Sequence, residues 1–347
     1  MAETLADVFN SDLFSLRELT RAINLIPNMY GRIGELKLFG TGRGVATTSV
    51  IIERNKNVLN LLPSGTRGAD GTKGVQGSRD ALSFAIPYIP HDDVVKAADV
   101  IGVRQFGSTN QMESVARKVN DKLITMRNKH AITLEWLRAG ALRGVVLDAD
   151  GTRVLLNLFS EFGITEKVVA FDLANDTADI PGKINEVLRY IEDNLEGDVM
   201  KYVHALCSPE FFDAFTTHPK VEEAYKFYTS TQNPLREDVR KRFEHKGIVW
   251  EEYRGQATSL QPDGTKIARR FIPAGDVRFF PMGTQETFDT VYAPADFIET
   301  VNTEGVELYA KQVVEKFGRW VDIHTQSSPL PFCMRPAVLV RGHRNAP

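Results

Sequence analysis

The residues whose types and spacing could support chemistry are few, and the first of them form a glycine-rich run. The run GTGRG at 40–44 has the glycine content of a phosphate-binding loop. Such a loop needs a terminal lysine followed by serine or threonine, so that the lysine reaches phosphate and the hydroxyl reaches magnesium. Here Val45 and Ala46 follow the last glycine. We therefore interpret the run as the turning base of a hairpin, for which glycine supplies the backbone freedom.

Histidine, cysteine and serine residues are the next candidates for a metal or nucleophilic site. His204 and Cys207 form an H-x-x-C pair, but on a predicted strand they face opposite sides of the sheet, and no second pair has metal-ligand spacing. We expect both to line the core. No G-x-S-x-G motif is present, and Ser78 lacks the strand–turn–helix context of a hydrolase nucleophile. His218 precedes Pro219 in a predicted turn between helices, where a solvent-exposed or capping role is favoured over a catalytic one.

Charged residues also give no clear catalytic pair. Glu251 and Glu252 are neighbours on a predicted strand and should point apart, which does not suit a paired acid and base. The densest basic run, 236–246, includes Arg240 and Arg242 but interleaves them with acidic residues. Mixed charge favours a solvated helix face or a subunit contact over a nucleic-acid surface. We expect no catalytic residue, no cofactor and no metal site.

Length and composition describe a chain that can bury a core. It has 347 residues, of which 42% are hydrophobic and 25% charged, with a net charge of −3. This suggests roughly two domains of ~150 residues and gives no broad basic field for nucleic acid. Two cysteines cannot form a disulfide framework, which favours a reducing compartment. The N-terminus does not resemble a signal peptide, and no apolar run is long enough for a membrane span.

The most unusual element is a glycine triplet repeat, with glycine at 65, 68, 71, 74 and 77. The period is that of collagen, but five triplets without proline cannot form a stable triple helix. Residues 82–88 alternate apolar and other side chains with strand period. A long hairpin over roughly 45–90 with a glycine-rich tip is therefore predicted. Its charges of both signs are candidate contacts with a neighbouring subunit: Arg67, Asp70, Lys73, Arg79 and Asp80.

A very long helix should follow the hairpin. Apolar residues keep a one-face helical period over 108–143, with Ser108 or Thr109 as the cap and Gly144 after the end. The next segment predicts a second hairpin that turns at Asp150-Gly151. A solitary helix of this length suggests a structural strut.

The remaining chain predicts a compact unit of helices and strands. One helix should begin at Pro181 and end at Gly197, and 200–208 should form a buried strand followed by a helix. The last ~50 residues predict two or three long strands. Periodic apolar surroundings place three tryptophans in the core: Trp136, Trp250 and Trp320.

The order of these elements and several strings resemble the lambda-type major capsid protein E family of tailed bacteriophages. The N-terminal strings are LTRAINLIPNMYGRIGELKLF and TTSVIIE. The later strings are HALCSPEFFDAFTTHPKVEEAY, FEHKGIVWEEYRG, GDVRFFPMG, FIETVNTEG and GRWVDIHTQSSPLPFCMRPAVLV. The resemblance covers nearly the whole chain. The number and order of the strings carry the resemblance, because none is a catalytic signature.

The resemblance implies the α+β tailed-phage major capsid (Johnson) fold. Its parts would be an N-terminal arm at 1–40, an extended β-hairpin loop at 41–100 with its tip at 65–77, a peripheral domain at 101–179 containing the spine helix 108–143, an axial domain at 180–290, and return strands of the peripheral domain at 291–347. The candidate contacts would then include Arg240 and Arg242.

The function implied by the resemblance is structural, not enzymatic. Copies would assemble as hexamers and pentamers into an icosahedral head around double-stranded DNA, held without sequence-specific binding. The virion shell would form in the host bacterial cytoplasm. Its partners would be a separate scaffolding protein and a portal, with a decoration protein as an optional third partner. Lys73 lies where some shells of this fold form an isopeptide crosslink, but this family generally uses decoration proteins instead. The alternatives are a hydrolase with a pocket in 180–290 and a nucleic-acid-binding module through 236–246.

Overall fold

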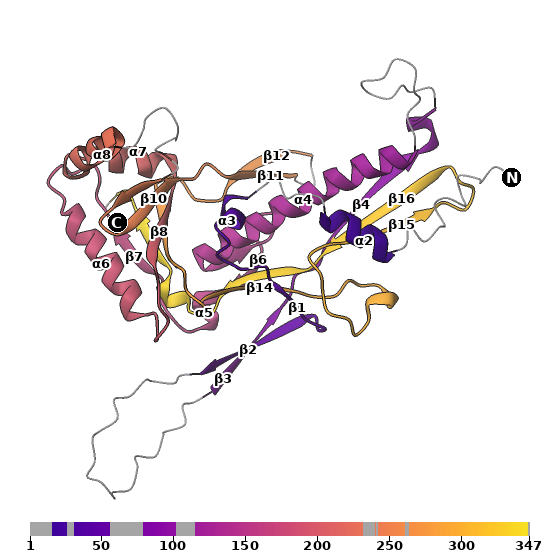
Figure 1. The fold of residues 1–347 in the computed structure, drawn as a ribbon, viewed down its shortest axis with the longest axis horizontal. Helices are drawn as coiled ribbons and strands as arrows, with labels where there is room; N and C mark the ends of the chain where they lie inside the picture. The colour runs from indigo at the N-terminus through magenta and orange to yellow at the C-terminus, as the bar shows by residue number, and fades with distance from the viewer. Residues whose placement is uncertain are drawn as a thin grey trace, which may run out of the picture.

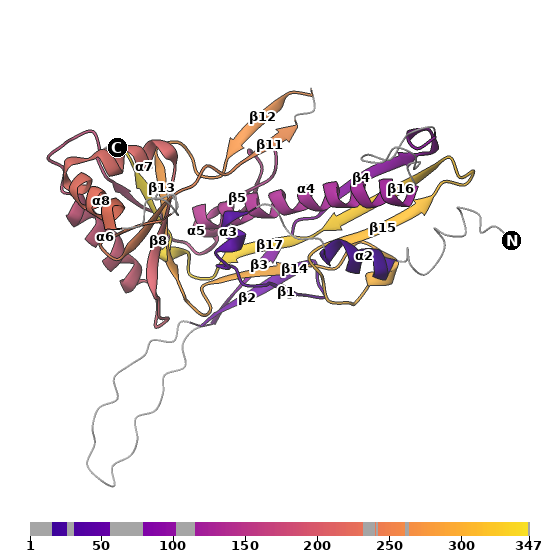
Figure 2. The ribbon, with the colours of Figure 1, turned by 45° about the horizontal axis from the view of Figure 1, so that its top comes forward.

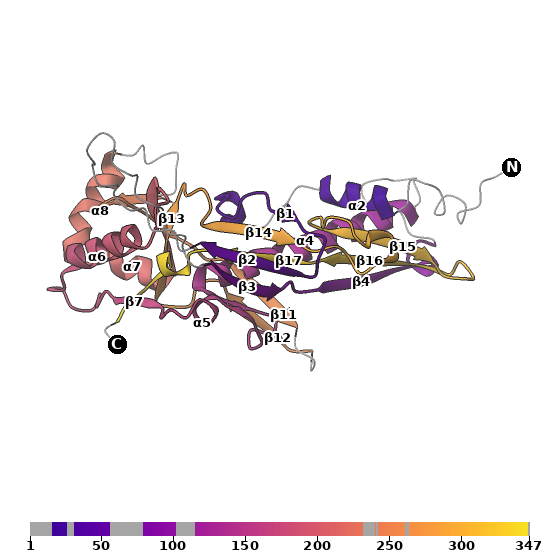
Figure 3. The same ribbon diagram turned by 90° about the horizontal axis from the view of Figure 1, so that it is seen from below.

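The subunit is long and thin, with a compact helix-covered sheet at one end. The computed structural model describes residues 16–25, 31–55, 79–101, 115–231, 240, 242–260 and 264–345. Figure 1 shows the long axis, along which helix α4 runs, and Figure 3 shows how shallow the body is when seen from below. This shape leaves long edges open to contact.

The helices and strands of the described residues are as follows. The helices are α2 (Leu16–Leu25), α3 (Arg32–Glu35), α4 (Val115–Arg143), α5 (Leu158–Glu161), α6 (Ile180–Asp193), α7 (Pro209–Thr217) and α8 (Pro219–Thr231). The first strands are β1 (Arg43–Gly44), β2 (Ser49–Asn55), β3 (Arg79–Ala85), β4 (Ile89–Lys96), β5 (Val145–Leu147), β6 (Val154–Asn157), β7 (Lys167–Ala170), β8 (Tyr202–Cys207) and β9 (Phe243–His245). The later strands are β10 (Ile248–Glu252), β11 (Gln256–Leu260), β12 (Lys266–Arg270), β13 (Asp276–Met282), β14 (Phe288–Tyr292), β15 (Tyr309–Val314), β16 (Trp320–Ser327), β17 (Pro329–Cys333) and β18 (Val340–His343).

The compact end contains a six-stranded mixed sheet in the order β7-β18-β13-β8-β10-β9. Helices α6, α7 and α8 lie at this end (Figure 1). Aromatic side chains fill the space between them and the sheet, and the ring centroids of Phe215 and Trp250 are 4.0 Å apart. Phe171, Phe211 and Phe279 are also buried there. Large aromatic burial of this kind dominates core energetics, so this unit has a core of its own.

Helix α4 joins the compact end to the elongated part. It ends at Arg143, as the sequence predicted, and Gly144 has φ +76°. A Cβ at Gly144 would lie 2.1 Å from the ring of Phe159, so glycine is required there. The predicted start at 108 and its caps lie outside the described residues. The N-terminal half of α4 shares a second apolar core with the three-stranded sheet β15-β16-β4 and helix α2, through Val119, Leu123 and Met126.

The predicted first hairpin is confirmed in its paired part. Strand β2 pairs antiparallel with β3, from Ser49 opposite Ala85 to Asn55 opposite Arg79. Val50, Ile52 and Phe84 are buried, and the hairpin leaves the body obliquely (Figures 1 and 2). The predicted tip at 65–77 lies outside the described residues.

The strand predicted over 82–88 is wrong in its second half. Strand β3 ends at Ala85, and β4 begins at Ile89 and pairs with β16 instead. Pro87 lies between them and cannot donate to a ladder. The chain therefore leaves the hairpin at this point and enters a different sheet.

The second hairpin, helix α6 and the closing strands lie within the described residues. The second hairpin is confirmed, because β5 pairs with β6 and Gly151 in the connection has φ +68°. Helix α6 starts as predicted, with Asp179 accepting from the Gly182 amide, but it ends at Asp193 rather than at Gly197. The closing segment forms four strands, not two or three, because a short 3-10 turn at Pro336–Val338 separates β17 from β18. Among the described helices, none has the length and apolarity needed to cross a membrane.

Candidate subunit-contact site

The candidate contact residues of the hairpin are only partly placed. Arg67, Asp70 and Lys73 lie outside the described residues. Arg79 and Asp80 belong to β3, where their backbones pair with Asn55 and Arg54 of β2. Within the described part of the hairpin, both therefore lie farthest from its buried root, which is formed by Val50, Ile52 and Phe84.

Arg240 and Arg242 lie elsewhere, beside edge strand β9 of the six-stranded sheet. Their side chains are 57% and 60% exposed. Nε of Arg242 donates to Oε1 of Glu244 at 2.9 Å, and Arg240 Nε is 3.9 Å from Oε2 of Glu252. The predicted helix face is wrong for 243–245, because these residues form β9 and pair with β10. The structure thus assigns the two arginines to a sheet edge and does not bring them together with Arg79.

His218 fits one of its two predicted alternatives, and Trp320 departs from its predicted core position. His218 is 2% exposed, so the exposed alternative is wrong. Its Nδ1 accepts from the Lys220 amide at 3.2 Å at the start of α8, which agrees with the capping alternative. Trp320 is half-buried rather than in the core, and its indole N–H donates to Asp322. Trp320 is the first residue of β16, the central strand of its sheet, so its side chain lies at the end of the strand rather than in the middle of the sheet.

The predicted core placement of His204 and Cys207 is confirmed. His204 is 3% exposed and Cys207 is fully buried. Burial raises the pKa of the Cys207 thiol well above its usual value, so a thiolate is disfavoured. Trp136 and Trp250 are also buried, as predicted.

The sequence has no local signal for a buried polar junction around Glu135, which is 1% exposed. Oε1 of Glu135 on α4 accepts from the Ile33 amide at 2.6 Å, and Oε2 accepts from the Gly34 amide at 3.1 Å. The hydroxyl of Tyr253 donates to Oε1 at 3.0 Å. Burial raises the pKa of Glu135, and these hydrogen bonds oppose that rise. One carboxylate thus fastens α3 to α4 and to the segment after β10.

A second buried polar group lies between α4 and β16. His130 Nδ1 is 2.8 Å from Oγ of Ser327, and Nε2 is 3.0 Å from Oγ1 of Thr325. Burial lowers the pKa of His130 to about 3, helped by nearby positive groups such as His91 and Arg127. The ring is therefore neutral near pH 7 and pins the helix to the strand.

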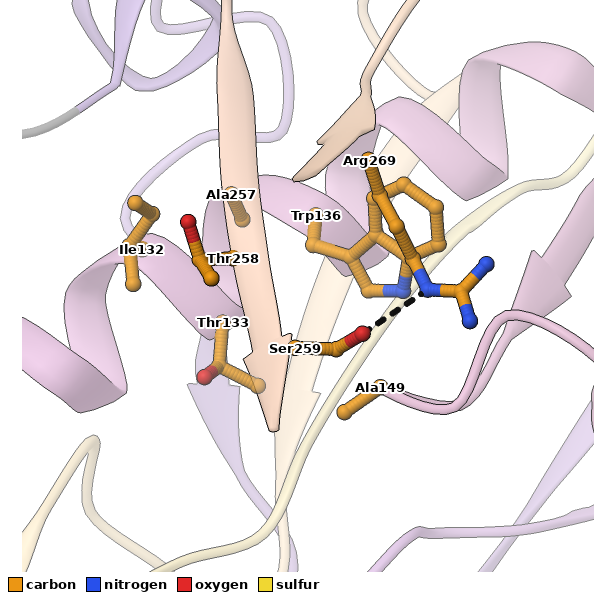
Figure 4. Close-up of a pocket in the computed structure, with 8 residues that line it drawn as sticks. All are labelled: Ile132, Thr133, Trp136, Ala149, Ala257, Thr258, Ser259 and Arg269. Atoms are coloured by element: carbon orange, nitrogen blue, oxygen red, sulfur yellow. Dashed lines mark hydrogen bonds between the residues drawn. The ribbon is translucent and has the colours of Figure 1, made fainter. Parts of the chain in front are cut away.

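A small pocket lies between α4 and the β11–β12 hairpin (Figure 4). Its volume is about 70 Å³, and its lining includes Ile132, Trp136 and Ala257. Ser259 is its most reactive-looking group, but its hydroxyl accepts from Arg269 Nε at 3.1 Å. A guanidinium cannot serve as a general base, and neither a carboxylate nor an imidazole is among the lining residues. The lining residues of this pocket therefore do not include the nucleophile–base pair that a hydrolase needs.

Open sheet edges are the other features available for contact. Strand β9 is an edge of the six-stranded sheet, and β15 and β4 are edges of the three-stranded sheet, among the described strands. Edge strands present unpaired backbone groups that can pair with another chain. Together with the hairpin, they favour an interface-rich subunit over a pocket-based activity.

Comparisons with known proteins agree with this interpretation. Residues 15–344 match the family model of phage major capsid protein E. The major capsid protein of Pseudomonas phage KPP10 is 33% identical over 347 residues, covering 95% of this chain and 96% of that protein. The major capsid protein of Salmonella phage Felix O1 is 28% identical over 369 residues, covering 94% and 95%. In fold, the chain is similar to the capsid of Ralstonia phage GP4, with a TM-score of 0.50 at 10% identity and coverage of 100% and 99%.

Proposed function

Because this chain belongs to the phage major capsid protein E family, we propose that its copies assemble as hexamers and pentamers into an icosahedral head enclosing double-stranded DNA. The chain is a structural major capsid protein of the virion, with the α+β fold of tailed-phage capsids. Its family is structural, and we propose that it has no enzymatic role.

The observation that carries the proposal is the projecting β2–β3 hairpin. Its root is held in the core by Val50, Ile52 and Phe84, while its paired strands extend away from the body (Figure 2). A two-stranded ribbon is marginal in water by itself. A neighbouring copy is the surface that would cover it.

The contact residues of this proposal fall into two groups. The hairpin group would reach across a neighbour and consists of Arg67, Asp70, Lys73, Arg79 and Asp80. The sheet-edge group, Arg240 and Arg242, would meet a neighbour at β9. Both groups contain charged side chains. At an interface, such side chains contribute more to the alignment of the subunits and the choice of partner than to affinity.

The proposed division of the chain follows the family pattern. The parts are an arm at 1–40, an extended loop at 41–100, a peripheral domain at 101–179, an axial domain at 180–290 and return strands at 291–347. Because β4 pairs with β16, we place the end of the extended loop proper before Ile89. Four strands of the six-stranded sheet and helices α6, α7 and α8 fall within the proposed axial part, whereas β7 and β18 of that sheet come from outside 180–290.

The proposed partners are those of head assembly. A scaffolding protein would direct curvature, a portal would occupy one vertex, and a decoration protein would be an additional outer partner. Packaged DNA would be held without sequence readout, which agrees with the net charge of −3. Assembly would take place in the host bacterial cytoplasm.

The test is a particle reconstruction. The full chain, produced together with the scaffolding protein, should sediment as closed shells, and electron cryomicroscopy should show six-fold and five-fold capsomers. Small subunits under every assembly condition would contradict the proposal. Denaturing electrophoresis of mature particles should give free subunit bands, whereas covalent ladders would indicate a crosslink through Lys73.

A further inference from the structure

The segment between β14 and β15, residues 293–308, presents apolar side chains on a firmly held backbone. Ile298 is 92% exposed and Val301 is 63% exposed. Between them, Thr300 is 6% exposed, and its hydroxyl donates to the Ala295 carbonyl oxygen at 2.6 Å. The buried Thr300 fixes the backbone of this turn, so the side chains of Ile298 and Val301 remain exposed to solvent. Exposed apolar groups on an ordered scaffold mark interaction surfaces.

Contacts at its far end attach this segment to the root of the β2–β3 hairpin. The amide of Gly305 donates to the Val45 carbonyl oxygen at 3.0 Å. A Cβ at Gly305 would lie 2.1 Å from the carbonyl oxygen of Tyr292. Because the two backbones are this close, only glycine fits at position 305. The contact also fixes the position of the segment relative to the body.

The apolar tip has an acidic rim. Asp296, Glu299 and Glu304 are all exposed on the same segment. Lys311 neutralises part of this charge, because its Nζ lies 2.6 Å from Oε1 of Glu299. A complementary partner surface would be apolar at its centre and basic around it.

The opposite long edge of the subunit has such a surface. The pocket between α4 and β11–β12 is apolar at Ile132 and Ala257, and Arg269 lines it (Figure 4). Strand β12 adds exposed Lys266, whereas the charge of Arg270 is already paired with Glu210. In Figures 1 and 2, β11–β12 lies on the opposite side of α4 from the segment between β14 and β15.

We propose that Ile298 and Val301 of one copy dock over the pocket between α4 and β11–β12 of a second copy, with the acidic rim facing β12. The inference rests on the proposed self-assembly of the chain. Because the two surfaces differ and lie on opposite edges, the contact is heterologous. A heterologous contact can close into a ring when its rotation permits, as a capsomer requires.

A cysteine pair across the contact gives a direct test. Thr258 lines the pocket and is exposed, so the double variant Ile298→Cys with Thr258→Cys should form disulfide-linked oligomers when assembled particles are oxidised. The native cysteines, Cys207 and Cys333, are fully buried and give little background. Each single variant should remain a monomer on non-reducing electrophoresis. Assembled particles without the double-variant crosslink, or crosslinking by Ile298→Cys alone, would overturn the docking.

Charge reversal gives an independent test. Glu304→Lys and Lys266→Glu should each lower the particle yield, and the combination should restore it because the charge pair is re-formed in reversed order. Glu192→Lys on α6, an exposed glutamate outside both surfaces, is the matched control and should assemble normally. Lack of rescue would contradict the docking. Failure of the unaltered chain to form particles would instead contradict the proposed function.

Discussion

The guanidinium of Arg32 is paired with the carboxylate of Glu251, which lies 219 residues further along the chain. Nε is 2.6 Å from Oε1, and Nη2 is 3.1 Å from Oε2. Burial raises the pKa of Glu251, but hydrogen bonds from His204 and Arg32 outweigh it and hold the pKa below its usual value. This fork-like pair fastens α3, at the end of the N-terminal part, to β10 of the six-stranded sheet.

Replacement of Arg32 by alanine should destabilise the subunit. Glu251 is 3% exposed and would keep only His204 beside its charge. Arg32 itself is 37% exposed, so the expected loss is ~1–3 kcal/mol, which is typical of leaving a buried partner unsatisfied, rather than the larger loss of a fully buried pair. Urea unfolding of the unassembled subunit measures it.

Arg254→Ala is the control for this change. Its guanidinium is 75% exposed and lies 3.9 Å from Glu252, so its removal should alter stability by less than about 0.5 kcal/mol. Equal losses in the free energy of unfolding for the two variants would show that the Arg32–Glu251 pair contributes no more to stability than an exposed arginine does.

His130 should make stability depend on pH below neutrality. Burial lowers its folded-state pKa to about 3, whereas an unfolded histidine titrates near ~6.5. The unfolded chain therefore binds this proton first. The contribution is complete above pH ~6.5 and is lost as the pH falls toward the folded-state pKa, at ~1.4 kcal/mol per pH unit.

His130→Gln removes this titration while keeping hydrogen-bonding groups for Ser327 and Thr325. Between pH 7 and pH 5 the unaltered subunit should lose ~2 kcal/mol more than the variant. Chemical unfolding at the two pH values measures the difference, and carboxylates common to both proteins cancel. Parallel loss in the two proteins would assign the acid sensitivity to other groups.

Gly305→Ala should disturb the segment between β14 and β15. The new Cβ would overlap the carbonyl oxygen of Tyr292 at 2.1 Å, and a forced backbone shift should cost ~1–3 kcal/mol or more. Gly163→Ala is the control, because its φ is +62° and no atom lies within 4 Å of its added Cβ. Its cost should be limited to the conformational strain of ~1 kcal/mol. The midpoint of thermal unfolding should therefore fall further for Gly305→Ala.

Deletion of 65–77 should impair assembly but leave the subunit folded. The paired root remains, with Val50, Ile52 and Phe84 in the core. Circular dichroism and urea unfolding should be nearly unchanged, while shells should form poorly or lose stability. Shells of normal yield and stability would show that the glycine triplets have no role in contact with a neighbour.

Elements with a strong local signal were predictable from the sequence. The end of α4 at Gly144, the Asp150-Gly151 hairpin and the buried strand β8 follow from backbone sterics and side-chain periodicity. The hairpin at β2–β3 was found in the same way. The family strings added the overall order, and no catalytic motif competed with a structural role.

Relationships between distant segments were decided only by the tertiary structure. The change of sheet after Ala85, the burial of His218 and the half-exposed position of Trp320 depend on which elements lie nearby. The Arg32–Glu251 pair has no local signature, because its partners are 219 residues apart. Local sterics and periodicity act over a few residues, so they determine helices, strands and turns. Pairing and burial depend on how the whole chain packs, and this physical difference separates what the sequence determined from what only the fold decided.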